Sequence, residues 1–276
     1  MSERSVRRTA WVAIPVLAAL TGCQTVQTTG SGVVGVDRPQ TMSTLVSSES
    51  FNRSAADAYR KVLQDAATKG QLNRDAAQVE RVRRIAARLI PDTAAFRADA
   101  PRWAWEVNVI ASNEVNAWCM PGGKIAVYAG LLDRLSPSDD ELAAVMGHEI
   151  AHALREHGRE QYSRVLVQSI GLDILGALAG MSESATSLSQ TFLDVMLNLP
   201  HSRTDESEAD RIGVELAARS GFDPHAAVSL WQKMSRLGGG QPPQWLSTHP
   251  SSESRTQDLQ TYSERVYPLY ESARKR

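Results

Sequence analysis

The sequence has no excess of charge of either sign. It carries 30 Lys and Arg against 31 Asp and Glu, and its formal net charge at pH 7 is -1. No long basic run appears, so we expect no nucleic-acid partner. Of the 276 residues, 42% are hydrophobic and 22% are charged, as in ordinary globular proteins. A chain of this length suffices for a buried core in one domain or two.

Cysteine is scarce, with only Cys23 and Cys119 in the chain. Cys119 lies in the apolar stretch Ala117–Met120, so we expect a buried small hydrophobic residue rather than a reactive thiol. If Cys23 carries a lipid, as argued next, Cys119 has no partner. The mature protein would then have no disulfide, even in an oxidising compartment.

The apolar run near the N-terminus is too short for a comfortable transmembrane helix. Three arginines precede this run, which extends from Trp11 to Leu20, and small residues follow it, as in a secretory signal. Leu20-Thr21-Gly22-Cys23 resembles the lipobox of bacterial lipoproteins, in which the Cys becomes the lipidated first residue. We therefore predict a signal peptide over residues 1–22 and lipidation of Cys23. The alternative is an ordinary cleaved signal followed by an incidental Cys.

The residue after Cys23 bears on the location of the protein. By resemblance to such lipoproteins, a residue other than Asp at this position favours the outer membrane, and this chain has Gln24. We expect a periplasmic protein held by its lipid at the inner leaflet of the outer membrane. Residues 23–50 are rich in Thr, Ser, Gly, Val and Gln, which predicts a tether leading to a domain over residues 51–276.

The domain is predicted to be mainly α with a small antiparallel β-sheet, an α+β fold. Apolar and polar residues alternate around Trp105–Val109, and a Pro-Gly-Gly turn precedes a second strand, Lys124–Tyr128. We expect this sheet to be the only one. Helices are expected over residues 54–89, 138–157, 163–180, 204–219, 224–237 and 252–262 or beyond. The apolar stretch 163–180 is predicted to be a core helix; alternatively it covers the site or touches a membrane surface.

The sequence His148-Glu149-Ile150-Ala151-His152 carries the chemistry. Ser138 and Glu141 have capping-box spacing, which places the motif on a helix. Residues four apart share one helical face, so His148 and His152 can bind one zinc ion, with Glu149 beside it as general base. A catalytic zinc needs a third protein ligand and an open position.

The third ligand must come from elsewhere in the chain. His157 lies nine residues after His148, about half a turn off the ligand face. Glu206 and Asp210 are four apart on one face of a later predicted helix, which suits a carboxylate ligand and a carboxylate that orients a ligating His. Glu208 lies nearly opposite Glu206, so only one of these two can face the metal.

HEIAH, then SRTDESEADRIG, then Thr248-His249-Pro250 together resemble the HtpX, Oma and BepA group of gluzincins, peptidase family M forty-eight. Segments around Asn116–Leu132 and Gly35–Arg38 also resemble it, so the resemblance spans nearly the whole mature chain. Membrane-spanning helices like those of HtpX and a repeat domain like that of BepA are missing. The short periplasmic lipoprotein members, such as LoiP, are most similar. The resemblance implies a zincin-like domain with one zinc per chain, bound by His148, His152 and Glu206.

The resemblance also suggests His249 and Asn116 as catalytic residues. His249 would either stabilise the oxyanion or act as a fourth zinc ligand that keeps the enzyme latent. The strand Lys124–Tyr128 is predicted to be an edge strand that binds an extended peptide. We therefore expect a zinc endopeptidase that degrades unfolded, misfolded or unassembled envelope proteins.

Two other functions remain open at this stage. One is a chaperone or assembly factor for outer-membrane proteins, working with the assembly machinery and with secondary proteolysis. The other is a structural zinc module, in which four protein ligands close the site.

Overall fold

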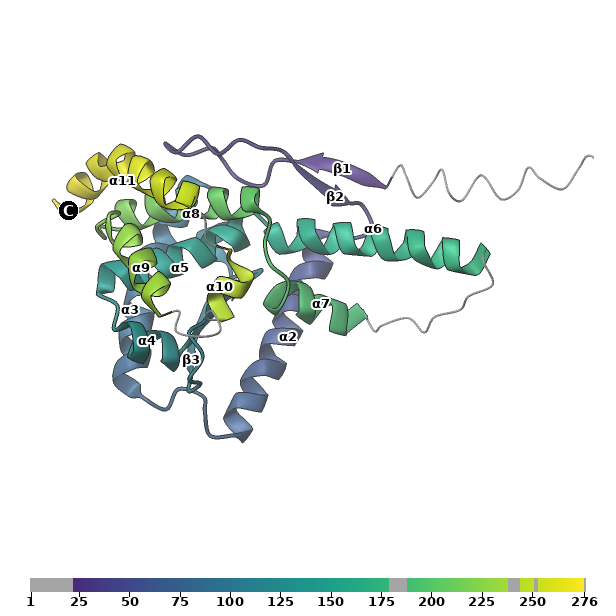
Figure 1. The fold of residues 1–276 in the computed structure, drawn as a ribbon, viewed down its shortest axis with the longest axis horizontal. Coiled ribbons are helices and arrows are strands. Elements are labelled where there is room, and N and C mark those ends of the chain that lie inside the picture. Colours follow the sequence, from purple (N-terminus) through teal and green to yellow (C-terminus); the bar gives the residue numbers. More distant parts are fainter. Residues whose placement is uncertain (1–21, 179–187, 238–243, 251–252, 276) are drawn as a thin grey trace, which may run out of the picture.

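The computed structural model describes residues 22–178, 188–237, 244–250 and 253–275. The signal peptide expected over residues 1–22 lies, apart from Gly22, outside the described residues, as does the Gly238–Gly240 loop. The described part is mostly helical, which confirms the predicted fold class (Figure 1). The helices are α2 (Ser48–Thr68), α3 (Ala76–Asp92), α4 (Ala129–Leu135), α5 (Asp139–Leu154), α6 (His157–Leu178), α7 (Leu188–Leu197), α8 (Arg203–Arg219), α9 (Ala226–Arg236), α10 (Gln244–Thr248) and α11 (Glu253–Ala273).

The sheet over residues 103–129 is mixed, not antiparallel as predicted. Strand β5 (Lys124–Tyr128) lies in the middle, pairing antiparallel with β4 (Ala117–Met120) and parallel with β3 (Glu106–Ile110). The prediction of an antiparallel sheet failed because the tight turn folds β4, rather than β3, back onto β5. Strand β3 pairs with the other edge of β5, where the two strands run in the same direction. Strand β5 is therefore central, and the edge strand on the side of helix α5 is β4.

Helices α5 and α8 form the centre of the domain, with α11 packed on α8 (Figure 1). Two glycines let their backbones approach closely: a Cβ on Gly147 would lie 2.9 Å from the carbonyl oxygen of Gly213. A Cβ on Gly213 would lie 2.8 Å from the backbone nitrogen of His148. Because real Cβ contacts are longer than this, a larger residue at either position would push the helices apart. This close contact brings side chains of both helices to one place.

The helix that carries the HEIAH motif ends earlier than predicted. Helix α5 ends at Leu154, and α6 begins at His157 in a new direction. Glu156 between them has a left-handed backbone with φ of 53°. Its carboxylate accepts a hydrogen bond of 2.6 Å from Arg97, a residue distant in sequence, and this tertiary contact favours the break. The helix predicted over 54–89 is likewise two helices, α2 and α3, because Gly70, at φ 63°, follows the end of α2.

The segment predicted to be a tether is largely packed on the domain. It contains a second, antiparallel sheet of β1 (Cys23–Val26) and β2 (Gln40–Ser43). Val34, Val36 and Met42 are buried, and the backbone N–H of Val34 donates to Glu215 at 2.9 Å. The composition is that of a linker, but its few apolar residues and Arg38 find partners more than a hundred residues away. We call residues 27–43 the N-terminal strap.

Helix α6 extends away from the body of the molecule, and α7 lies beside it (Figure 1). The first residues of α6, through Glu160, are buried, whereas Val167 is 37% exposed. Of residues 163–180, predicted to be a core helix, Ser163 is buried and residues 167–169 are exposed. The side chains from residue 170 onward, and residues 179 and 180 entirely, lie outside the described part. Among the described residues, no helix is both long and apolar enough to cross a membrane.

Candidate metal centre

Helix α5 presents the three motif residues on its buried side. Ser138 accepts from the N–H of Glu141 and the Glu141 carboxylate accepts from the N–H of Ser138, which confirms the predicted capping box. His148, Glu149 and His152 are each 5% exposed or less. Three acidic residues in the first turn suit the positive end of the helix, so this end is well fixed.

Helix α8 begins with a second capping box, formed by Ser202 and Asp205. This start sets the rotation of the helix, so that Glu206 and Asp210 face α5. Glu208 points to the other side, where it binds Arg38, Arg155 and His157. Helical spacing alone left open which of Glu206 and Glu208 faces the motif histidines, and the family resemblance selected Glu206; in the structure Glu206 is the one that lies beside His148 and His152.

Four side chains bring potential metal ligands together: His148, His152, Glu206 and His249. Nε2 of His148 lies 3.1 Å from Nε2 of His152 and 3.6 Å from Oε2 of Glu206. Nδ1 of His249 lies 3.2 Å from Nε2 of His148 and 2.9 Å from Oε1 of Glu206. Ligands about 2.1 Å from a tetrahedral zinc are about 3.4 Å apart, so the observed spacings fit a zinc ion.

The protonation states also suit a metal. Burial disfavours the imidazolium form and holds the pKa of His152 well below its ordinary value, with His201 and His148 acting in the same direction. Burial opposes ionisation of Glu206, but His249 and His152 outweigh it and hold the pKa well below its ordinary value. A neutral imidazole and a carboxylate are the forms that zinc binds.

Behind His148 lies a carboxylate held by an arginine. Nδ1 of His148 lies 3.0 Å from Oδ1 of Asp210. Arg255 of α11 donates two hydrogen bonds to Asp210, at 2.7 and 2.8 Å, and its Nη1 lies 2.6 Å from Oε2 of Glu206. Asp210 therefore occupies the predicted orienting position, and Arg255, which the sequence analysis did not single out, fixes both carboxylates.

Helix α10 covers the side of the site where Glu149 lies. Oε1 of Glu149 accepts a 2.8 Å hydrogen bond from the indole of Trp245 and lies 3.5 Å from Nε2 of His249. The rings of Trp245 and His249 are stacked, with centroids 4.7 Å apart. Trp245 of α10 thus contacts both the predicted general base and His249, the residue that follows this helix.

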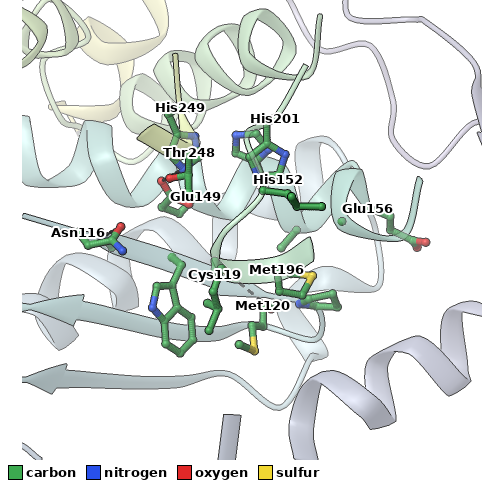
Figure 2. A pocket seen from close by; sticks show the side chains of 17 residues that line it. Asn116, Cys119, Met120, Glu149, His152, Glu156, Met196, His201, Thr248 and His249 are labelled. Atoms are coloured by element: carbon green, nitrogen blue, oxygen red, sulfur yellow. Dashed lines mark hydrogen bonds and ion pairs between the residues drawn. The ribbon is translucent and has the colours of Figure 1, made fainter. Parts of the chain in front are cut away.

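A small cavity of about 30 Å³ lies between α5, strand β4 and the segment before α8. Figure 2 shows Glu149, His152, His201 and His249 gathered on one wall, with Asn116 at the start of β4. The Asn116 side chain accepts a 2.9 Å hydrogen bond from the N–H of Ala117. Cys119 also lines the cavity and is 5% exposed, and its burial raises the pKa of the thiol, as expected for an inert cysteine.

Two further histidines lie beside the cluster: His201, which sequence reasoning missed, and His157, which it set aside as a ligand. The ring of His201 lies 4.1 Å, centroid to centroid, from that of His152, and its Nδ1 is buried without a hydrogen-bond partner among the described residues. His157, correctly excluded from the ligand face, contacts His152 from behind through Nδ1 atoms 2.9 Å apart. In a continuous helix, a position nine residues after His148 would not contact the ligands. The contact forms because the chain changes direction at Glu156.

Comparisons with known proteins agree with this geometry. The model of a family described as Peptidase family M48 matches residues 76–263. The mitochondrial metalloendopeptidase OMA1 of Arabidopsis thaliana is 40% identical over 156 residues, which cover 56% of this chain and 31% of the relative. The metalloprotease YcaL of Escherichia coli (strain K12) is 26% identical over 251 residues, covering 88% of this chain and 91% of YcaL.

The β-barrel assembly-enhancing protease of Yersinia pestis is 28% identical over 183 residues, covering 62% of this chain and 37% of the relative. The chain thus spans well under half the length of this relative and about a third of the Arabidopsis one.

Proposed function

The chain belongs to peptidase family M48, and on that premise we propose that it is a zinc-dependent endopeptidase with one zinc per chain. The observation that carries the proposal is the convergence of His148, His152 and Glu206 from two helices at spacings that suit a tetrahedral ion. Glu149 follows His148 directly and lies beside this cluster.

In this proposal zinc supplies Lewis acidity, which polarises the scissile carbonyl and makes water a stronger acid. Glu149 takes the proton of the attacking water and later delivers it to the leaving amine. For this the carboxylate must exchange the indole of Trp245 for water. Asp210 orients His148, and Arg255 holds Asp210 in place. Asn116 lines the same cavity, and we propose it as a stabiliser of the oxyanion.

We assign His249 the role of a latent fourth ligand. Its Nδ1 lies within 3.2 Å of His148 and 2.9 Å of Glu206, where a fourth ligand of a tetrahedral ion would lie. The cavity of about 30 Å³ has room for a water molecule but not for a peptide, so a substrate requires α10 and His249 to move. The rival role as oxyanion donor applies only to a form in which His249 has left the ligand cluster.

The substrate class we propose is unfolded or misfolded polypeptide of the bacterial envelope. Strand β4 is an edge strand beside the cavity, and its backbone can pair with an extended peptide regardless of side chains. The lipobox at Cys23 supports an envelope location, and the likeness to YcaL of Escherichia coli over most of both chains is consistent with a bacterial protein.

A second candidate is an assembly factor for outer-membrane proteins with secondary or latent proteolysis. The name of the Yersinia pestis relative, which pairs β-barrel assembly with proteolysis, favours it. A Glu149→Gln variant separates the two, because a pure assembly factor does not need the base. The peptidase proposal requires this variant to lose cleavage and to retain captured envelope proteins.

The first test is the metal content of the purified protein. We expect one zinc per chain by elemental analysis and loss of stoichiometric zinc in His148→Ala, because the variant keeps only two of the three permanent ligands, with the displaceable His249 as their sole supplement. His225→Ala is the matched control, since His225 is a half-exposed histidine paired with Asp223 and Glu264 away from the cluster. Full zinc content in His148→Ala would refute the site.

The same zinc measurement on His249→Ala addresses the structural-module alternative. A closed structural site would lose zinc with its fourth ligand. A catalytic site would keep zinc through His148, His152 and Glu206.

A further inference from the structure

A second buried cluster of titratable side chains lies behind the metal ligands and has no part in the proposed chemistry. It consists of the buried His157, Glu208 and Arg155, joined at its outer end by Arg38, whose side chain is 32% exposed. His157 and Arg155 are 0% exposed and Glu208 is 5% exposed. Burying several charged groups is costly unless they are fully paired, so such a cluster requires a reason.

His157 connects this cluster to a metal ligand. Its Nδ1 lies 2.9 Å from Nδ1 of His152, and its Nε2 lies 3.1 Å from Oε2 of Glu208. His152 turns its Nε2 toward His148 and Glu206. With Nε2 on a metal, His152 keeps its proton on Nδ1 and donates it to His157. His157 then carries its own proton on Nε2 and donates it to Glu208, so one set of tautomers satisfies every contact.

The two metal-binding histidines are thus supported in the same way. His148 donates to Asp210, a carboxylate held by Arg255. His152 reaches Glu208 through one additional ring. Glu208 is in turn held by Arg155, at 2.9 Å from Nε, and by Arg38. Each ligand therefore ends on an arginine-bound carboxylate, the arrangement that fixes ring orientation and raises ligand basicity.

The arginine at the far end belongs to the N-terminal strap. Nε of Arg38 donates to Glu208 at 2.6 Å, and its terminal nitrogens bind Glu160 at 3.0 Å and Asp205 at 3.0 Å. Arg155 donates to the backbone carbonyl of Arg38 at 2.8 Å, which fixes the strap on the body.

The carboxylate of Glu208 accepts hydrogen bonds from His157 at 3.1 Å and from Arg38 at 2.6 Å. The strap therefore helps to hold the acceptor that His157 requires. His157, Asp205 and Glu208 could also be taken for a second metal site. The two guanidinium groups on Glu208 already supply the positive charge there, which disfavours a cation.

We propose that His157 is a positioning residue that holds His152 in its zinc-binding orientation, and that Arg38 makes zinc affinity depend on docking of the N-terminal strap. The proposal rests on the proposed function, since it takes the cluster to be a zinc site. It assigns the strap a role besides anchoring: a segment that begins a few residues after Cys23 tightens the metal centre.

The test is zinc affinity of the full-length protein, measured by competition with a chromophoric chelator at pH 7. His157→Phe removes both ring nitrogens and should weaken zinc binding by about 10- to 100-fold. His157→Asn keeps an acceptor near the position of Nδ1 and should stay within about threefold of the wild type. Arg38→Gln should weaken binding by about three- to tenfold, because it leaves Glu208 less well held.

The matched control is Arg60→Gln, which removes an exposed arginine paired only with Asp57 within α2. Thermal unfolding of the metal-free proteins separates loss of affinity from loss of folding. If His157→Phe does not fold, Glu208→Gln, which keeps the shape and removes the charge, takes its place with the same expectation.

Wild-type affinity in His157→Phe, or equal losses in the Phe and Asn variants, would overturn the positioning role. Wild-type affinity in Arg38→Gln would overturn the role of the strap. Absence of zinc from the wild-type protein would instead overturn the proposed function.

Discussion

At the scale of single residues, the proposed latency of the enzyme depends on the position of His249. Its Nδ1 lies among the ligand atoms of His148 and Glu206, whereas its Nε2 faces Glu149. Burial lowers the pKa of His249, but the carboxylates of Glu149 and Glu206 outweigh it and raise the pKa. A bound cation acts in the opposite direction, since it favours the neutral ring.

We expect His249→Ala to increase cleavage of an unfolded protein substrate. If His249 has left the ligand cluster in one tenth of the wild-type molecules, removing its side chain raises turnover by about tenfold. Turnover is measured with a fluorescently labelled unfolded protein at saturating zinc, with His225→Ala as the control. A fall on the order of a hundredfold would show that His249 is an oxyanion donor instead. A change of less than about twofold would leave it as an ordinary loop residue.

At the scale of elements, the proposed function requires α10 to move when a substrate binds. It is a short helix of five residues: the N–H of Trp245 donates to Val115 at 3.2 Å, that of His201 donates to Thr248 at 3.0 Å, and the Trp245 side chain is buried in the core. The indole of Trp245 donates to Glu149 and its ring stacks on His249, so this side chain links the general base to the latent fourth ligand.

Trp245→Phe keeps an aromatic ring at this position but removes the hydrogen bond to Glu149. Such a bond contributes about 1 kcal/mol, so the open form and the basal turnover should rise by about fivefold. The same cleavage assay measures this effect. Trp103→Phe is the control, because the Trp103 indole binds Asp99 outside the cavity. A loss of turnover would mean that Trp245 takes part in catalysis rather than in closing the site.

At the scale of the whole molecule, the predicted anchor and the extended α6 lie on the same side. In Figure 1 the outer end of β1, where the strand begins at Cys23, and the far part of α6 lie on the same side of the catalytic body. Cys23 is exposed, so it is accessible for modification. A lipid on Cys23 would therefore hold that side toward the membrane and leave the body facing the periplasm.

Cys23→Ala is expected to release the protein from membranes in a fractionation assay and to abolish acyl labelling, since it removes the sulfur that carries the lipid. Cys119→Ala is the control and should keep both, because Cys119 is buried. Membrane association that is unchanged, together with an unlabelled wild type, would contradict the anchor. It would point to a plain secretory signal and to another membrane contact, such as α6.

The sequence by itself determined the parts of this protein that depend on local periodicity. The capping box at Ser138 and the spacing of His148 and His152 sufficed to predict a capped helix with two imidazoles on one face, because α-helical geometry is nearly the same in every protein. The helix carrying Glu206 and Asp210 was predicted for the same reason, and family resemblance selected Glu206.

Only the tertiary structure decided which groups surround those residues, because their partners are far apart in the chain. The parallel pairing of β3 with β5, the break at Glu156 and the docking of the strap all depend on long-range contacts. His157 illustrates the difference. Along a continuous helix it would point away from the site. The change of direction before α6 instead places its ring 2.9 Å from His152, between a metal ligand and the carboxylate of Glu208.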